Sequence, residues 1–177
     1  MIIIEKNLEQ LTQQYGICDR SLVDDFSLKV QLGNHCYRPK IYDKPVVFGL
    51  LPNPTDIFHE KETLQQNLVL KPGEQLITCS KHIYKIPLDY FGLLQTKGTL
   101  ARLFVVASCN DGQIEPGFEG YITFELVNHS PWVIEIPSGS DIAQMYLIKC
   151  SSPAENAYKG RYSEVAKQGA TIPIFNI

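Results

Sequence analysis

One carboxylate stands in the middle of a regular strand pattern. The stretch YITFELV, residues 121–127, alternates apolar side chains with a mixed set that includes Glu125. Because strand side chains have a period of two, the apolar set forms a core face and the mixed set the opposite face. A glutamate on such a face is usually solvated in an antiparallel sheet. The alternative is that a ligand or another subunit covers this face and Glu125 does chemistry there, although the strand alone favours solvation.

A second stretch, QTKGTLARL (95–103), combines cations, a hydroxyl and a glycine between two strand-like runs. Backbone amides around Gly98, with Lys97, Thr99 and Arg102 nearby, suit a phosphate group. The same letters also describe a short helical turn on the surface with solvated charges. Taken alone, the stretch favours that turn.

Several well-known catalytic signatures are missing from the chain. There is no HxE paired with PCxxC and no HExxH, and the four histidines are scattered, so we expect no zinc and no protein-held metal. GxGxxG and GxSxG are also missing, as is GxxxxGK followed by Ser or Thr. This excludes a Rossmann fingerprint, the common serine-hydrolase cue and a P-loop.

Bulk composition limits the class of protein. A chain of 177 residues is long enough for one domain with a substantial core, and 44% hydrophobic with 20% charged residues indicates an ordinary soluble globular protein. The net charge of −3 provides no basic field for a nucleic-acid backbone, so no nucleic-acid partner is expected.

The five cysteines are odd in number and widely spaced, which fits a reducing cytosol better than a disulfide framework. The apolar run after Met1 is only three residues long, too short for a signal peptide or a membrane span. The sequence therefore predicts a cytoplasmic protein with no membrane partner.

The elements that must position these residues are mostly strands. Helical spacing predicts a short amphipathic helix over 5–15, and after it the helical period disappears. Residues 39–66 look irregular, with one or two short strands. Strands separated by Pro-Gly or Ser-Gly turns predict an all-β sandwich or jelly-roll-like barrel. These strand runs lie in 26–34 (ended by a Gly-Asn turn), 67–87, 90–108, 112–128 and 132–150.

The residues of two later segments do not by themselves decide between a structural role and a ligand-binding role. In IPSGSDIAQMYLI (136–148), Ile142 and Met145 look structural, and Gln144 is either a ligand contact or, by preference, solvated. The tail 156–173 is polar, aromatic and basic without a core pattern, which is typical of disorder. The alternative is a lid that folds over a ligand.

The motifs occur in a recognisable order. TKGTLARL, IEPGFEGYITFEL, IPSGSDIAQM and the tail SSPAENAYKGRY with QGAT resemble motifs of the dCTP deaminase family, within the trimeric dUTPase-like superfamily. That family shows GKSSLAR, IDPGFxG followed by I-x-LE, PGMxIxQ, and a tail PYxGKY ending in QxGxT. FSLKVQLGN and LVLKPGEQLI are similar to its SSxDLRLG strand and LxPGE turn, so the resemblance runs from about residue 26 to 171.

The resemblance implies an architecture. We expect an all-β distorted jelly roll or β-barrel of the dUTPase-like type, with a short N-terminal helix. One β domain would span 1–155, and 156–177 would form a C-terminal tail that acts as the active-site lid. The family also implies a homotrimer in which each active site is built from more than one chain.

The resemblance changes the interpretation of Glu125. The sequence TFEL places it at the catalytic acid/base of dCTP deaminases, where dUTPases lack a carboxylate. The implied reaction is metal-free at the reacting carbon: Glu125 takes a proton from a water that attacks C4 of cytosine and relays it towards departing ammonia. By resemblance Arg102 organises this pocket, Lys97 lies near the phosphates, and Mg²⁺ binds through the triphosphate.

Further substrate-binding positions follow from the same resemblance. Glu115 would face the deoxyribose, and Phe118 would stack near the sugar and exclude a 2′-hydroxyl. The remaining matched positions are Gly98, Thr99, Asp111, Gln144, Tyr158, Arg161 and Gln168.

The chain departs from the family pattern in several places. Gly98 replaces a serine that helps hold the water, and Asp111 stands where a small residue offers its carbonyl. Lys29 and Gln31 replace an Asp and an Arg, and two extra residues precede Gln168. The predicted function is deamination of dCTP to dUTP and ammonia. A dUTPase-type pyrophosphatase, a bifunctional enzyme that continues to dUMP, and a non-catalytic nucleotide-binding regulator are the alternatives.

Overall fold

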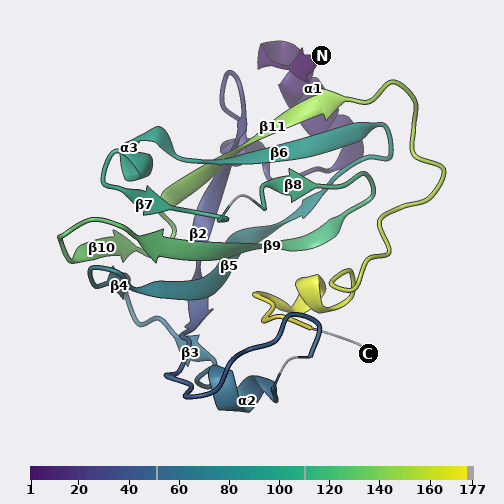
Figure 1. The fold of residues 1–177 in the computed structure, drawn as a ribbon. Helices are drawn as coiled ribbons and strands as arrows, with labels where there is room; N and C mark the ends of the chain where they lie inside the picture. Colours follow the sequence, from purple (N-terminus) through teal and green to yellow (C-terminus); the bar gives the residue numbers. More distant parts are fainter. Residues whose placement is uncertain (51, 110, 175–177) are drawn as a thin grey trace.

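The computed structural model describes residues 1–50, 52–109 and 111–174, and the chain is mostly β (Figure 1). The helical elements are α1 (Glu5–Tyr15), η1 (Arg20–Leu22), α2 (Pro54–Ile57), α3 (Gly98–Ala101) and η2 (Val165–Gln168). The strands are β1 (Ile2–Ile3), β2 (Leu28–Tyr37), β3 (Glu62–Thr63), β4 (Asn67–Leu70), β5 (Gln75–Lys85), β6 (Tyr90–Thr96), β7 (Val105–Val106), β8 (Gln113–Ile114), β9 (Glu119–Asn128), β10 (Ile134–Pro137) and β11 (Asp141–Lys149).

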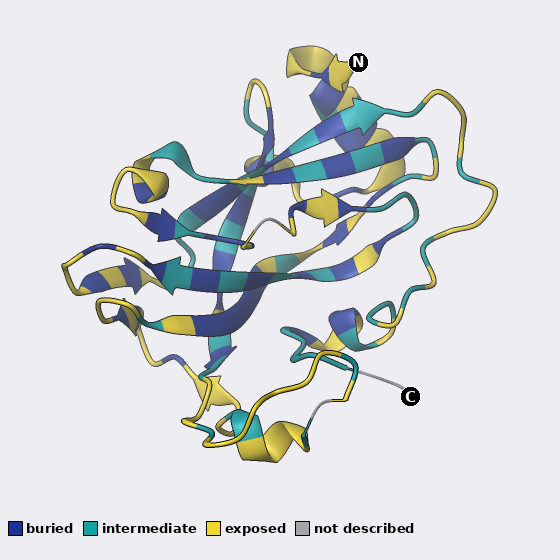
Figure 2. Ribbon diagram, viewed as in Figure 1, coloured by how far each residue is buried: buried dark blue, intermediate teal, exposed yellow. Residues whose placement is uncertain are grey.

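Among the described residues, nine strands form one sheet in the order β7-β9-β5-β2-β11-β6-β8, with β1 added to β11 and β3 to β2. The sheet curls into a half-barrel, and β10 pairs with β4 beside it. Buried and less buried residues alternate along its strands, as Figure 2 shows, because one face of each strand points into the core. The expected all-β, dUTPase-like jelly-roll fold is confirmed.

The predicted N-terminal helix is confirmed with its bounds. Leu8 and Leu11 are buried against the sheet, which explains the helical spacing of the apolar residues. The helix ends where Gly16 adopts a left-handed backbone conformation, φ 61°, and its N–H donates to the carbonyl of Thr12. None of the helices in the described ranges is long and apolar enough to cross a membrane.

The predicted end of the first long strand at Gly33–Asn34 is wrong. Strand β2 continues to Tyr37. It pairs with β11 up to Gln31 and with β5 from Leu32 on, and the register of the β5 pairing shifts between Leu32 and Cys36. A Cβ on Gly33 would lie 2.8 Å from the carbonyl oxygen of Cys79. The glycine therefore permits a close backbone approach at a bulge, which a local pattern cannot distinguish from a turn.

The region 39–66 is irregular as predicted, with the short strand β3, but it also contains the one-turn helix α2. Pro54 occupies the first turn, and the side chain of Asn53 accepts a hydrogen bond from the Thr55 N–H. These are N-terminal helix signals that the composition of the segment concealed.

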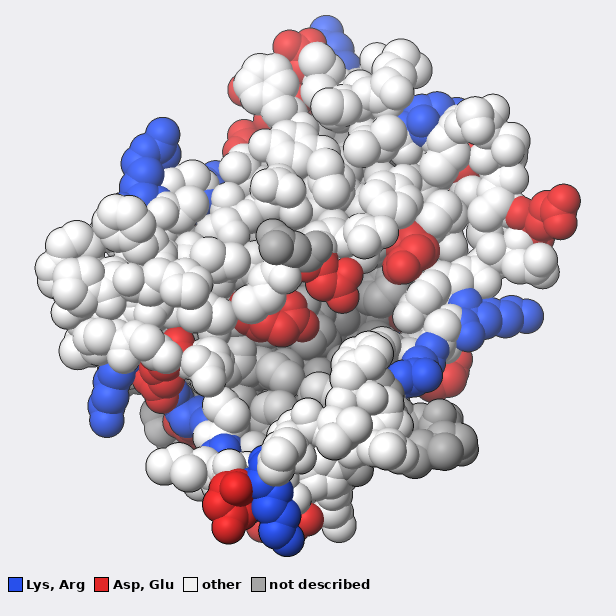
Figure 3. All heavy atoms as spheres, in the orientation of Figure 1, with Lys and Arg blue, Asp and Glu red and all other residues white. Residues whose placement is uncertain are grey.

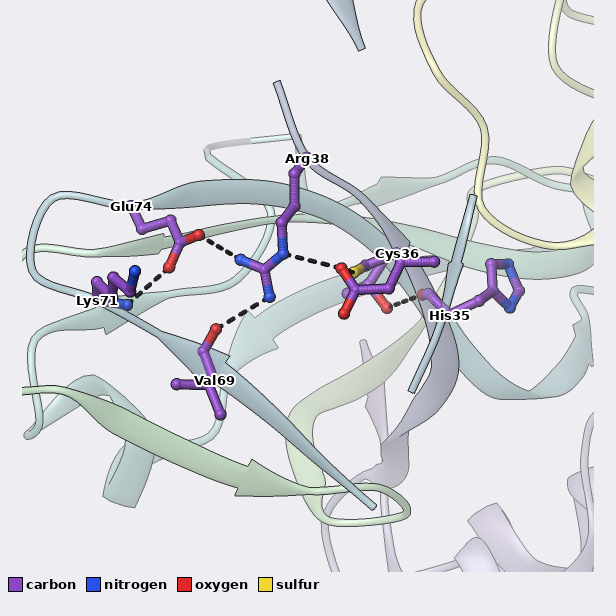
Figure 4. Close-up of polar contacts among 8 residues, drawn as sticks. His35, Cys36, Arg38, Val69, Lys71 and Glu74 are labelled. Carbon is purple, nitrogen blue, oxygen red and sulfur yellow. Dashed lines mark hydrogen bonds and ion pairs between the residues drawn. The ribbon is translucent and has the colours of Figure 1, made fainter. Parts of the chain in front are cut away.

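An arginine joins β2 to the beginning of β5 (Figure 4). The guanidinium of Arg38 donates to Glu62 at 3.0 Å, to the carbonyl of Val69 at 3.1 Å and to Glu74. Glu74 also accepts from the backbone N–H of Lys71 at 2.7 Å, which closes the turn between β4 and β5. This polar cluster holds the start of β5, the strand that pairs with β9 along almost its whole length.

The described part of the C-terminal segment packs against the sheet. Ala166, in η2, is 3% exposed and belongs to the hydrophobic core, and η2 packs on β9. The interpretation that the tail has no core pattern is wrong at this position. One buried alanine and one buried glycine, Gly169, leave no apolar periodicity for sequence analysis to detect.

Candidate functional site

A cavity of about 230 Å³ lies between β9, the turn that precedes it, and the C-terminal segment. It is the hollow near the centre of the face in Figure 3, where acidic side chains gather. The described residues that line it are Ile77, Asp111, Gln113, Ile114, Glu115, Phe118, Tyr121, Ile122, Thr123, Glu125, Tyr158, Tyr162, Ala166, Thr171 and Pro173.

Glu125 reaches this cavity from the middle of β9. The strand alternates buried and half-buried residues, and Glu125 belongs to the half-buried face, opposite Phe124 and Leu126. Its register partner on β5 is Ile77, which also lines the cavity. The predicted core face is therefore confirmed, and the opposite face is covered rather than simply solvated.

The surroundings of Glu125 favour a carboxyl group that exchanges a proton. Its Oε2 atom is buried and has no hydrogen-bond partner in the described structure. Burial raises the pKa of Glu125 above its usual range, and the negative charge of Asp111 adds to the effect. A carboxyl group with a raised pKa, beside a cavity of this size, is suited to general acid–base chemistry on a bound ligand.

The turn before β9 shapes one wall of the cavity. Gly117 has a φ of 81°, and a Cβ there would lie 2.5 Å from Ala157, so only glycine lets the tail cross so closely. The Tyr158 N–H donates to the carbonyl of Pro116 at 3.0 Å, and the ring of Tyr158 stands 6.2 Å from that of Phe118. The first part of the tail is thus attached beside the aromatic wall.

The end of the tail closes the opposite side. The N–H of Thr171 donates to the hydroxyl of Thr123 at 3.2 Å, and the two threonine hydroxyls are 3.1 Å apart. Tyr162 and Pro173 complete this wall. The C-terminal segment therefore covers the outer face of β9 without contributing a strand among the described residues.

The second predicted group of residues lies elsewhere. Lys97, Thr99 and Arg102 are on or next to α3, which Figure 1 places far from the C-terminal segment. Arg102 is exposed, and none of these residues lines the cavity. The stretch forms the short helical turn that the sequence favoured, and within one chain it does not meet Glu125.

A sequence model of the family described as dCTP deaminase-like matches residues 4–150. The chain belongs to this family. The family model includes both α3 and β9 and ends before the tail that covers the cavity.

Individual relatives agree with the family. Over 90 residues the chain is 39% identical to "dCTP deaminase, dUMP-forming" of Corynebacterium kroppenstedtii, covering 51% of this chain and 48% of that protein. It is 26% identical over 179 residues to "dCTP deaminase" of Metallosphaera sedula, covering 99% of both. The match therefore spans about half the length of the first relative and nearly all of the second.

One solved structure has the same fold. The crystal structure of 2′-deoxycytidine 5′-triphosphate deaminase from Agrobacterium tumefaciens superposes with a TM-score of 0.62 at 20% identity, covering 82% of this chain and 47% of that chain. At this identity the similarity concerns the fold alone.

The family's motif positions fall into two sets in this structure. Five predicted residues come together around the cavity, and the other seven do not line it. Those around the cavity are Asp111, Glu115, Phe118, Glu125 and Tyr158; those outside are Lys97, Gly98, Thr99, Arg102, Gln144, Arg161 and Gln168.

Three of the outlying residues have other contacts. Gln144 is half-buried and its amide donates to the hydroxyl of Ser27 at 3.1 Å, so the preferred solvated position is wrong. The guanidinium of Arg161 donates to the carbonyl of Ile174 at 2.8 Å, a contact between two parts of the C-terminal segment. Gln168 lines a second cavity, next to His35 and Cys79.

Sequence analysis missed several residues of the cavity wall. Tyr121 and Thr123 share the outer face of β9 with Glu125, so the period of two could have identified them. Gln113, Tyr162 and Thr171 carry no such signal: Gln113 lies on the short strand β8, and the docking of the tail brings Tyr162 and Thr171 to the wall. Among the described residues, no group of three or more His, Cys, Asp or Glu is placed to hold a metal.

Proposed function

We propose that this protein hydrolytically deaminates a deoxycytidine nucleotide, converting dCTP and water to dUTP and ammonia. The observation that carries the proposal is the half-buried carboxyl of Glu125, with its unpartnered Oε2 beside a cavity and its pKa raised by burial. Membership of the dCTP deaminase-like family supports the substrate class.

In the proposed reaction Glu125 moves protons at the base. Its carboxylate takes a proton from the water that attacks C4 of cytosine and delivers it to the ring nitrogen. A second transfer protonates the amino group, the C4–N bond breaks, and ammonia leaves. A carboxyl group whose pKa lies nearer to neutrality performs both steps more readily. Phe118 and Tyr158 would enclose the sugar, with Glu115 accepting from its hydroxyl.

The phosphates need cations that this cavity lacks. None of the described lining residues is Lys, Arg or His, whereas Lys97 and Arg102 lie together at α3. We propose that a second copy of the chain brings its α3 to the open side of the cavity, so that a homotrimer holds interfacial active sites. Mg²⁺ brought with the triphosphate would neutralise part of the phosphate charge.

A second product is supported by the relatives. Several curated relatives are named as dUMP-forming, including that of Corynebacterium kroppenstedtii. A bifunctional enzyme would, after deamination, direct a second water to the α-phosphate of dUTP; a new P–O bond to that water would form as the bond to the leaving pyrophosphate breaks, which gives dUMP and pyrophosphate. The relative matched over its whole length is named as dCTP deaminase without that product.

Product analysis tests these alternatives. The protein with Mg²⁺ is incubated separately with dCTP and dUTP, and nucleotides, ammonia and pyrophosphate are measured, with Glu125→Gln as the control chain. We expect ammonia and dUTP from dCTP, and neither from the control. Pyrophosphate together with dUMP would establish the bifunctional reaction. Pyrophosphate from dUTP without ammonia from dCTP would overturn deamination, and binding without turnover would indicate a regulator.

A further inference from the structure

The cavity is strongly acidic for a site that receives a polyanionic nucleotide. Asp111, Glu115 and Glu125 all line it, and no described lining residue carries a positive charge. Burial raises the pKa of Glu125 and of the Tyr158 hydroxyl; the charge of Asp111 adds to both shifts and that of Glu115 to the second, so these groups act on one another across the same space. The part of the ligand that enters the cavity must therefore offer hydrogen-bond donors rather than further negative charge.

Asp111 is an exposed residue of the cavity lining that follows two residues with unusual backbone conformations. Ser108 and Cys109 have positive φ values of 77° and 29°, which side-chain-bearing residues rarely adopt. The N–H of Asp111 donates to the carbonyl of Ser108, and the thiol of Cys109 donates to the carbonyl of Glu125 at 3.5 Å. The loop that carries Asp111 is thus attached to the residue that carries the proposed chemistry. Backbone conformations of this kind persist where the surrounding structure holds them.

The chemistry of the two bases differs at one atom. Position 4 of cytosine carries an amino group, a donor that carboxylates accept, whereas position 4 of uracil carries a carbonyl oxygen. A carboxylate beside a carbonyl oxygen places two acceptors together, and neither is satisfied. A carboxylate next to Glu125 can therefore distinguish the substrate of deamination from its product.

We propose that Asp111 is a specificity-determining residue that accepts a hydrogen bond from the exocyclic amine of the base and disfavours the uracil product. This inference rests on the proposed deaminase function. It also gives the enzyme a means of releasing product, because the group that attracts the amine repels the carbonyl that replaces it. Further hydrolysis of dUTP in the same cavity would have to overcome this repulsion.

Equilibrium binding tests the proposal in chains that do not turn over. In the Glu125→Gln background, the affinities for dCTP and dUTP with Mg²⁺ are measured by titration calorimetry. We expect the parent to prefer dCTP by about tenfold to a hundredfold, as one good carboxylate contact to a base provides. Asp111→Ala removes the acceptor and should abolish most of that preference. Asp111→Asn should raise dUTP affinity further, since an amide can donate to the carbonyl.

Glu119→Gln is the matched control. It removes one carboxylate from the same strand, outside the cavity and paired with Lys85, and should leave the preference unchanged. In the background that keeps Glu125, Asp111→Asn should also move the acid limb of the pH profile of kcat/KM to lower pH, because the charge that raises the pKa of Glu125 is lost. If Asp111 only maintained the fold, its substitution would change neither the preference for dCTP over dUTP nor the acid limb of the pH profile.

The outcomes separate the two hypotheses. If the parent binds neither nucleotide, the proposed function fails and this inference with it. If the parent binds both and the Asp111 variants keep the original ratio, with melting temperatures that show a folded chain, only the role of Asp111 is overturned.

Discussion

The cavity beside β9 and the helical turn α3 differ in charge, in burial and in position. The cavity is lined by Asp111, Glu115 and Glu125 and is covered by the C-terminal segment. The α3 turn begins after Lys97 and ends at Arg102, which is exposed. A nucleotide has a neutral base and a polyanionic triphosphate, so each region suits one end of it and neither suits both.

The opposite charges of the cavity and the α3 turn explain why the two regions lie apart within one chain. Placing Arg102 within a chain's own cavity would pair it with the carboxylates and lower the pKa of Glu125. In the trimer that we propose, the cations would instead come from a neighbouring subunit, at the open side of the cavity, where the phosphates of a nucleotide would lie. The experiments below test the comparison, beginning with the largest expected effect.

The largest effect is expected at the cavity. Glu125→Gln keeps the shape of the side chain and removes its proton exchange, so turnover of dCTP should fall by about a hundredfold to ten-thousandfold. Nucleotide affinity should change little. Single-turnover rates and calorimetric affinities measured on the same preparation check this. Retained turnover would return Glu125 to the role of a half-buried strand residue.

At α3 the expected loss is in binding. Arg102→Ala or Lys97→Ala should weaken dCTP affinity by about tenfold to a hundredfold, since each removes a charge-assisted contact to the nucleotide. Lys159→Ala, which removes an exposed tail lysine that does not line the cavity, is the control.

Mixing the two kinds of variant tests whether the regions meet between subunits. Glu125→Gln and Arg102→Ala chains are each expected to be inactive or weak. When they are unfolded together and reassembled in equal amounts, about one quarter of the sites in a cyclic trimer should combine both native residues. The recovered activity should therefore be about one quarter of that of the unaltered trimer. No recovery, with trimers formed, would place both residues in a single chain's site.

Removal of 156–177 tests the cover of the cavity. The truncated chain loses the Thr171–Thr123 contact and the packing of Tyr158 on Phe118, so nucleotide affinity should fall by about tenfold. Because Ala166 is part of the core, the free energy of unfolding should also fall, by roughly 1–3 kcal/mol. Chemical denaturation and calorimetry measure the two effects. An unchanged affinity would show that the tail is not a lid.

The smallest expected effect concerns the attachment of the tail at His35. Its Nε2 accepts a hydrogen bond from the N–H of Ala170 at 3.1 Å, which requires the unprotonated ring. The groups facing it are Asn34, Cys79 and Lys61, and burial together with Lys61 lowers the pKa of His35. The contact is therefore fully present above the ordinary histidine pKa and is lost as the pH falls through the lowered one.

Hydrogen exchange measures this attachment. Amides of residues 165–174 should lose protection, by no more than about 1 kcal/mol, between about pH 7.5 and about pH 5.5. His35→Gln keeps an acceptor that does not titrate, so its tail protection should not depend on pH. His129→Gln, an exposed histidine elsewhere, is the control. Protection that falls equally in both variants would exclude His35 as the cause.

Local sequence patterns were sufficient to predict several helices and strands and the exposed or buried face of their residues. The alternation of 121–127 placed Glu125 opposite a core face, the spacing in 5–15 predicted α1, and the Pro-Gly turn predicted β4 and β5. These features depend on side chains near one another in sequence, whose periodicity reflects a single buried face. The order of motifs likewise identified the family without any long-range contact.

Other features were decided only in three dimensions. The passage of β2 through Gly33 depends on the carbonyl of Cys79, and the docking of the tail depends on His35 and Thr123. The sequence by itself determined which residue types are available and which face of each strand carries them. The tertiary structure decided that Asp111 shares a cavity with Glu125 and that Arg102 does not, because contacts between residues far apart in the chain depend on packing that no local pattern encodes.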